Sequence, residues 1–308
     1  MAKPLVHVAR MQHYIQGGII MVVQHNMQAA NANRMLGMNV KAVAKSTEKL
    51  SSGYKVNRAA DDAAGLSISE KMRNQIRGIN QAVSNSEDGQ YLIQTAEGNL
   101  NEIHSILQRM GELATKGANE VNATDDRKAI ADELHQLACE IDSISAKAQF
   151  NGKYLLSEDK NPDLAKGLDL QVGANSGETM NIKLQKINTE ALKVDDLKDD
   201  VTAGADYANG TSTGTDKYRD LMTTVTSAVK TVSDTRSQLG AIQNRLDYTI
   251  NNLENYSENL TSSESNIRDT DMAKEMVNYS KNNILQQAAQ SMLAQANQSN
   301  QGVLSLLQ

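Results

Sequence analysis

The chain has 308 residues, of which only 3% are aromatic, with no tryptophan, one phenylalanine and two prolines. A core without large aromatic side chains has to be built from aliphatic residues and methionine, which favours long helix bundles over a thick globular enzyme. A formal net charge of −6 disfavours nucleic acid as a partner. No stretch reaches the roughly 20 apolar residues of a membrane-spanning helix, and the single cysteine excludes an internal disulfide.

The first feature in chain order is a change of character at Met21. Before it lie a Gly17-Gly18 pair and apolar residues with no polar face, and the apolar run 19–23 is shorter than the roughly 7–15 residues of a secretory signal core. After it the sequence is rich in Asn, Gln and Ala. If the protein is exported, we expect a route other than the general signal peptide.

Two helices are predicted next, over about 62–117 and 123–148. In both, apolar residues recur in steps of four and three, which is the spacing of one helix face. The polar stretch GANEVNATDD, residues 117–126, separates them, so the pair is predicted to form a helical hairpin. The two stripes consist of Leu92, Ala96, Leu100, Ile103, Leu107, Met110 and Ala114, and of Ile130, Leu134, Leu137, Ile141 and Ile144.

The middle of the chain, about 149–215, has a different pattern. An Asn-Gly pair at 151–152 is a turn signal, and residues 168–184 alternate between apolar and polar types on both sides of a glycine-rich centre. These residues are predicted to form loops and short β-hairpins. The stretch 201–216 is small, polar and rich in Gly and Thr, which predicts a surface loop or a hinge.

A heptad repeat is the strongest physical signal, and it predicts a helix over about 220–267. Apolar residues recur every seven positions for about 43 residues, roughly 65 Å of helix at 1.5 Å per residue. The sequence therefore predicts a mostly α fold: an antiparallel coiled-coil or helical-bundle rod over 62–267, formed by the N- and C-terminal halves, with a small β-hairpin and loop region in the middle. The seam consists of Val225, Val232, Leu239, Leu246, Leu253, Leu260 and Ile267.

The two ends, 21–61 and 268–308, carry only narrow apolar stripes among Asn, Gln, Ala and Ser. Burial of such stripes in a single chain cannot offset an ordering entropy of about 1–2 kcal/mol per residue. We therefore predict that both ends are disordered in the monomer and become helical when many copies pack together. The stripes include Met27, Met35, Met38, Met272, Met276, Ile284, Met292, Val303, Leu306 and Leu307.

Two long stretches resemble bacterial flagellin. Residues 50–114, with the run LSSGYKVNRAADDAAGL, resemble its N-terminal region, AQFNGKYLL (148–156) is similar to the end of that region, and residues 265–308 resemble its C-terminus. Because little lies between the matching parts, the chain is similar to a short flagellin without large outer variable domains. Flagellins of this kind begin at a sequence like MVVQHNMQAANANRMLG, so we expect residues 1–20 to be a non-native upstream extension.

The resemblance implies a structural subunit, not an enzyme, that polymerises into the flagellar filament outside the cell and serves swimming. It implies further copies of the chain, an export chaperone, the type III export apparatus, and the filament cap and hook-associated proteins as partners. The segments 21–61 and 268–308 would form the inner tube of the filament. The assembly residues it implies are Asp61, Asp62, Gly65 and Leu66 of the DDAAGL element, together with Ile284, Met292, Val303, Leu306 and Leu307. The DDAAGL element is equally consistent with an ordinary helix cap.

The resemblance also implies that the monomer binds the flagellin-sensing Toll-like receptor of animal hosts. The residues that match the family's pattern are Gln108, Arg109, Glu112, Leu113 and Glu133. Arg109 and Leu113 lie four apart and are expected to project from one helix face. The plainer alternative is that Leu113 flanks the apolar seam while Arg109 and Glu133 form an exposed ion pair worth about 0–1 kcal/mol.

Three other functions are compatible with parts of the sequence. A hook-filament junction protein of the flagellum shares the paired terminal helices, but the ending QANQSNQGVLSLL resembles flagellin more closely. His135 and Cys139 could supply two zinc ligands from one helix face, but no clustered His or Cys completes a site, and no HExxH or phosphate-binding loop is present. We therefore predict no metal and no cofactor. A membrane-surface helix is disfavoured because the polar faces of the ends carry Asn and Gln more than Lys or Arg.

Overall fold

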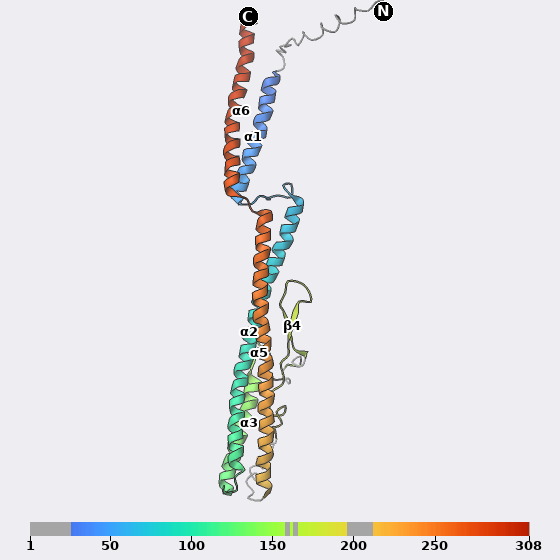
Figure 1. The fold of residues 1–308 in the computed structure, drawn as a ribbon, viewed down its shortest axis with the longest axis vertical. Helices are drawn as coiled ribbons and strands as arrows, with labels where there is room; N and C mark the ends of the chain where they lie inside the picture. The colour runs from blue at the N-terminus through green and yellow to red at the C-terminus, as the bar shows by residue number, and fades with distance from the viewer. Residues whose placement is uncertain (1–25, 158–160, 163–165, 196–211, 308) are drawn as a thin grey trace, which may run out of the picture. The chain divides into compact units, whose positions relative to one another are not determined.

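The structure is a computed structural model that describes residues 26–157, 161–162, 166–195 and 212–307. Figure 1 shows a mostly helical chain. Its helices are α1 (Met27–Ser52), α2 (Ala63–Gly117), α3 (Thr124–Lys147), α5 (Ser212–Arg268) and α6 (Met272–Leu307). Its strands are β1 (Gln149–Phe150), β2 (Lys153–Tyr154), β3 (Leu168–Gln171) and β4 (Thr179–Ile182), which pair as two antiparallel hairpins. The predicted fold class is confirmed.

The chain divides into two compact units. A terminal unit contains α1, α6, the first residues of α2 up to Ser69 and the end of α5 from Glu264, and a central unit contains residues Glu70–Ser263. The predicted upstream extension, 1–20, lies outside the described residues, as do the side chains of Val303, Leu306 and Leu307.

The core of the central unit is built from α2, α3 and α5. The stripe of α2 from Ala96 onward and most of that of α3 are buried as their spacing predicts, with Leu100, Leu107 and Leu134 fully inaccessible to solvent, whereas Leu92 is only partly buried. On α5 the heptad seam is buried from Val225 to Leu246, whereas its last three positions are only partly buried and do not belong to the core cluster. The seam is therefore fully buried only over its first four positions.

The start of α5 differs from the prediction. The helix begins at Ser212 rather than near 220. The predicted loop 201–216 is therefore wrong for residues 212–216, and residues 196–211 lie outside the described part of the chain. Tyr218 explains the extension, because it stands one heptad before Val225 and is fully buried. Its hydroxyl donates to the backbone carbonyl of Arg127 at 3.0 Å, which satisfies the buried polar group.

The middle segment forms the short hairpins that the sequence predicts. Asn151 and Gly152 connect β1 to β2 with φ of 48° and 77°, the left-handed values that a two-residue turn requires. In the second hairpin Met180 and Ile182 alternate inward and are buried, as period-two patterning demands. Farther along, Thr189 fastens the segment to α3, because its backbone N–H and its hydroxyl both donate to the Asp142 carboxylate at 2.9 and 3.1 Å.

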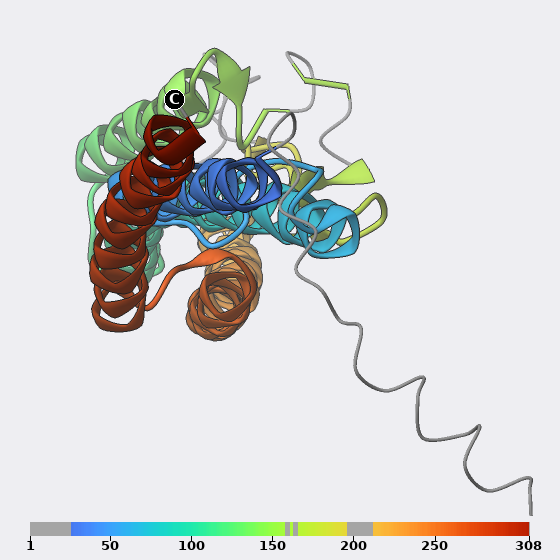
Figure 2. The same cartoon turned by 90° about the horizontal axis from the view of Figure 1, so that it is seen from above.

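In the terminal unit, α1 and α6 lie side by side (Figures 1 and 2). Asn26 caps α1 by accepting from the backbone N–H of Ala29 at 2.9 Å, and its side-chain amide donates to the carbonyl of Ala296 at 3.0 Å. Asn39 donates to the carbonyl of Leu285 at 3.3 Å. Both ends of the chain are thus helical and paired, while their predicted ordering only upon assembly stays a prediction.

Candidate assembly and recognition surfaces

The α1–α6 pair leaves its apolar side chains uncovered. Ser46 is the only buried residue of α1, and none of the described side chains of α6 is buried. A groove of about 690 Å³ runs between the two helices and is lined by Met35, Leu285, Met292 and several alanines. Apolar side chains that are more than 40% exposed include Met27, Met35, Met38, Val40, Met272, Met276, Val277, Ile284, Leu285 and Met292. An apolar surface of this extent requires a partner.

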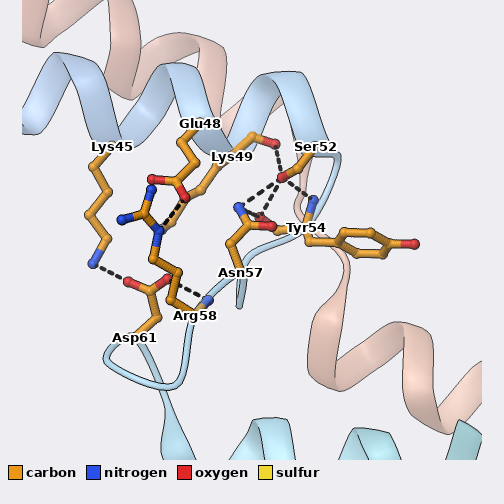
Figure 3. A network of polar contacts seen from close by, with 8 residues as sticks. All are labelled: Lys45, Glu48, Lys49, Ser52, Tyr54, Asn57, Arg58 and Asp61. Carbon is orange, nitrogen blue, oxygen red and sulfur yellow. Dashed lines mark hydrogen bonds and ion pairs between the residues drawn. The ribbon is translucent and has the colours of Figure 1, made fainter.

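A polar joint connects α1 to α2, and Figure 3 shows it from close by. The loop 53–62 begins at Gly53, whose φ of 75° is the left-handed value typical of a helix C-cap, and then folds back along the last turns of α1. Lys45 contacts Asp61 at 2.7 Å and Glu48 contacts Arg58 at 2.9 Å. The ion pair with Lys45 lowers the pKa of the Asp61 carboxyl and raises that of the Lys45 ammonium.

The DDAAGL element is the start of α2. Asp62 accepts from the backbone N–H of Gly65 at 2.9 Å, which is the geometry of an N-cap. Gly65 is buried, and a Cβ there would overlap the Asp62 carboxylate, which would have to shift from its capping position to accommodate a side chain. The backbone N–H of Leu66 donates to the carbonyl of Asp62 at 3.0 Å. The cap predicted for this element is confirmed, while its role in subunit contact stays a prediction.

Four of the five predicted receptor residues lie together on the surface of the central unit. Arg109 of α2 donates to Glu133 of α3 through Nη2 at 2.9 Å and Nε at 3.1 Å, and to Glu112 through Nη1 at 3.1 Å. All three side chains are exposed. The hydrogen bonds with Glu133, and then Glu112, raise the pKa of the guanidinium. Gln108, also exposed, contacts His104 at 3.0 Å.

The expectation that Leu113 projects from the same face as Arg109 is wrong. Leu113 is 2% exposed and packs in the apolar core with Met110 and Ala114. Four residues turn an α-helix by about 400°, so Leu113 is displaced by about 40° from Arg109, and this step turns it onto the side that faces the core. Leu113 is therefore a core residue beside the exposed cluster.

Other chemistry is sparse in the described part of the chain. His135 and Cys139 approach each other only to 4.0 Å, and the described residues contain no group of three or more side chains that could hold a metal ion. Among the described helices, none is both long and apolar enough to cross a membrane. Tyr218 is the structural anchor that the sequence reading missed, although its place seven residues before Val225 could have revealed it.

Comparison with known proteins decides the family. Residues 23–161 match the bacterial flagellin N-terminal helical region and residues 222–307 match the bacterial flagellin C-terminal helical region. A flagellin of Halalkalibacterium halodurans is 50% identical over 287 residues, which cover 93% of this chain and 100% of that protein. The chain belongs to the flagellin family.

Further relatives agree. A flagellin of Bacillus subtilis is 47% identical over 307 residues, covering 93% of this chain and 100% of the relative. A solved structure of a candidate flagellar hook-associated protein from Vibrio parahaemolyticus aligns with a TM-score of 0.56 at 16% identity, covering 68% of this chain and 100% of that one, and this likeness concerns the fold alone.

The predicted resemblance to a short flagellin is confirmed. This flagellin is a structural, non-enzymatic subunit of the bacterial flagellar filament. The filament lies outside the cell and serves motility. The alternative of a hook-filament junction protein lacks comparable support, because the relatives at 50% and 47% identity are flagellins.

Proposed function

We propose that the α1–α6 pair is the polymerisation element of this flagellin, and that neighbouring copies cover its apolar surface with their own terminal helices. The observation that carries the proposal is the near absence of burial: only Ser46 is buried among the described side chains of the two helices. Each large apolar side chain that becomes buried contributes about 1.5–3 kcal/mol. Repeated contacts along a helical polymer can therefore supply the free energy that a single chain lacks.

Removal of residues 272–308 tests this proposal. The truncated chain should remain a helical monomer, because the seam from Val225 to Leu246 keeps its partners, and it should fail to elongate filament seeds in light scattering. Truncated protein that elongates seeds at the normal rate would show that the terminal pair is not the polymerisation element.

A point variant refines the same test. Ile284→Asn removes a side chain that is 66% exposed, so the stability of the monomer should hardly change while seed elongation slows by about tenfold or more. Gln287→Asn alters an exposed polar residue three positions later and is the matched control. Equal elongation by both variants would contradict the proposed role of the apolar stripe.

The same exposed stripe supports further partners before and after assembly. In the cytoplasm its apolar side chains need cover, which an export chaperone that binds the C-terminal segment would provide ahead of passage through the type III export apparatus. At the ends of the filament, the cap and hook-associated proteins would meet these helices. A peptide of residues 272–308 that fails to bind any export chaperone of its own species would contradict the first part.

A second proposed function is recognition of the monomer by the flagellin-sensing Toll-like receptor. What supports it is the exposed cluster of Gln108, Arg109, Glu112 and Glu133, in which the guanidinium lies between two carboxylates. Arginine forms forked hydrogen bonds to carbonyls and carboxylates and is frequent among the residues that dominate binding energy. Leu113 has no part in this proposal, because it is buried.

Alanine variants of this cluster separate recognition from stability. Arg109→Ala and Glu133→Ala should each weaken binding to the receptor ectodomain by more than about 1 kcal/mol. Both should leave the stability of the fold almost unchanged, because the ion pair is exposed. Glu140→Ala, on an exposed position of the same α3 helix, is the control and should bind normally. If wild-type monomer does not bind, or if both cluster variants bind as well as wild type, this proposal fails.

A further inference from the structure

The loop 53–62 is held against α1 by two ion pairs whose charges are arranged in a pattern. On α1, Lys45 and Glu48 lie three residues apart and therefore on one face of the helix. On the loop, Arg58 and Asp61 are also three apart and are joined by a turn, in which the Asp61 N–H donates to the Arg58 carbonyl at 2.9 Å. The positive charge of each element faces the negative charge of the other (Figure 3).

This arrangement distinguishes the observed register of the loop from shifted ones. In the observed register, Lys45 meets Asp61 and Glu48 meets Arg58. A shift of the loop by three residues along α1 would place Lys45 opposite Arg58 in one direction, or Glu48 opposite Asp61 in the other, and either shift brings together two like charges. A single exposed ion pair contributes little to stability. The difference between an attraction and a repulsion is larger, and unfavourable pairing is a common source of specificity in proteins.

We propose that loop 53–62 is a charge-coded latch, in which Lys45, Glu48, Arg58 and Asp61 select one register of the loop on α1 and thereby position the start of α2. The link to α2 is covalent and immediate: Asp61 is held by Lys45, and the next residue, Asp62, caps α2 through Gly65. An open latch would leave that cap without its anchor. The latch is a property of the single chain and goes beyond polymerisation and receptor binding.

Neutral contacts hold the start of the loop. The Ser52 hydroxyl accepts from the Asn57 amide at 2.8 Å and from the Tyr54 N–H at 3.1 Å, which closes the turn after α1. On the other side, the Lys55 N–H donates to the Arg268 carbonyl at 2.6 Å, and the Thr270 N–H donates to the Gly53 carbonyl at 2.9 Å. Arg268 also stacks over the Tyr54 ring at 4.7 Å. The charged pairs hold the far end of the loop, at Arg58 and Asp61, against α1.

The surrounding charges do not replace the four of the latch. The other charged side chains on α1 and the loop are Arg34, Lys41, Lys49, Lys55 and Asp62, and Arg268 and Asp269 stand where α5 ends. Asp62 is engaged as the cap, Arg268 lies over Tyr54, and the Lys55 ammonium donates to the Asn266 carbonyl at 3.4 Å. The depressed pKa of Asp61 and the raised pKa of Lys45 agree with a pair that is charged across the neutral range.

Charge reversal with complementation tests the latch in the full-length monomer. Lys45→Glu and Asp61→Lys each create a repulsive pair, and the double variant restores an attractive pair of opposite polarity. Backbone hydrogen exchange at Asp61, Gly65 and Leu66 reports on the turn and on the cap. We expect each single variant to accelerate exchange at these amides by about fivefold at low salt and the double variant to return within about twofold of wild type. Added salt should reduce the difference.

One control variant and one independent pair of residues complete the test. Lys41→Glu makes the same change of net charge on an exposed position of α1, one turn before the latch, and should leave exchange unchanged. The second pair gives an independent arm through Glu48→Arg, Arg58→Glu and their double variant. The proposal is overturned if the double variants exchange as fast as the single ones, or if Lys41→Glu has the same effect as Lys45→Glu.

Discussion

The terminal and central units use their helices in different ways. In the central unit, α2 and α5 bury continuous stripes, and Leu100, Leu107 and Leu239 are inaccessible to solvent. In the terminal unit, α1 and α6 bury one serine among their described side chains. The central unit therefore has a complete core of its own. Under the proposed function, the terminal pair is one part of an interface that neighbouring copies complete.

Side-chain choice accounts for the difference. The central stripes use Leu, Ile and Val, which have few rotamers and pack against defined neighbours. The terminal stripes contain a larger share of Met, set among Ala, Asn and Gln, and methionine adapts to irregular surroundings. Adaptable side chains suit a surface that must be soluble before assembly and buried afterwards.

The largest expected effect is a difference in stability loss between a Leu→Ala substitution in the central unit and one in the terminal unit. Leu107→Ala removes a fully buried side chain from the central core and should lower the free energy of unfolding of the monomer by about 2–5 kcal/mol. Leu285→Ala removes a side chain that is 43% exposed in the terminal unit and should cost less than about 1 kcal/mol. Denaturant unfolding followed by circular dichroism measures both. Equal losses would contradict the contrast between the units.

A second pair of variants tests how tightly the central unit is packed at the end of α2. A Cβ at Gly117 would overlap the buried Tyr218 ring, so Gly117→Ala should destabilise the monomer by about 1–3 kcal/mol. Gly98 lies on the same helix with nothing within 4 Å of the added Cβ, so Gly98→Ala should stabilise by about 0.5–1 kcal/mol. The two variants differ only in their surroundings, and thermal unfolding compares them directly. A gain in stability for Gly117→Ala would show that the ring can move aside.

Hydrophobic periodicity predicted the central unit well because burial there follows the helical repeat. The stripes of α2 and α3 and the seam from Val225 to Leu246 were identified from spacing alone. The start of α5 was missed because Gly and Thr in 201–216 suggested a loop, although Tyr218 continues the heptad and is buried. One buried aromatic outweighed the local propensity of several small residues.

The joint and the exposed face of α2 were less predictable for a different reason. The fold-back of loop 53–62 depends on charges at 45, 48, 58 and 61 that meet only in three dimensions, and no hydrophobic period marks them. Leu113 was misplaced because spacing of four alone does not say on which side of a stripe a residue falls. Family resemblance supplied the surface residues, but burial had to come from the structure.

The smallest expected effect is a pH dependence confined to the joint of the terminal unit. The pKa of Asp61 is lowered from its ordinary value of 3.8, chiefly by the hydrogen bond from Lys45, so this pair contributes stability above about pH 3.8 and loses it as the pH falls through the folded pKa. The pKa of Lys45 is raised above 10.5, so its contribution is complete below that pH and is lost as the pH rises through the folded value. Between these limits the joint should not respond to pH.

An NMR titration of the Asp61 carboxyl in full-length monomer measures the first limit, and Lys45→Met should return the pKa of Asp61 toward 3.8. Because both groups are exposed, central-core packing should persist while the joint opens at low pH. Simultaneous loss of signals from Asp61 and from the Leu107 methyl groups would mean that acid unfolds the whole chain, not the joint alone.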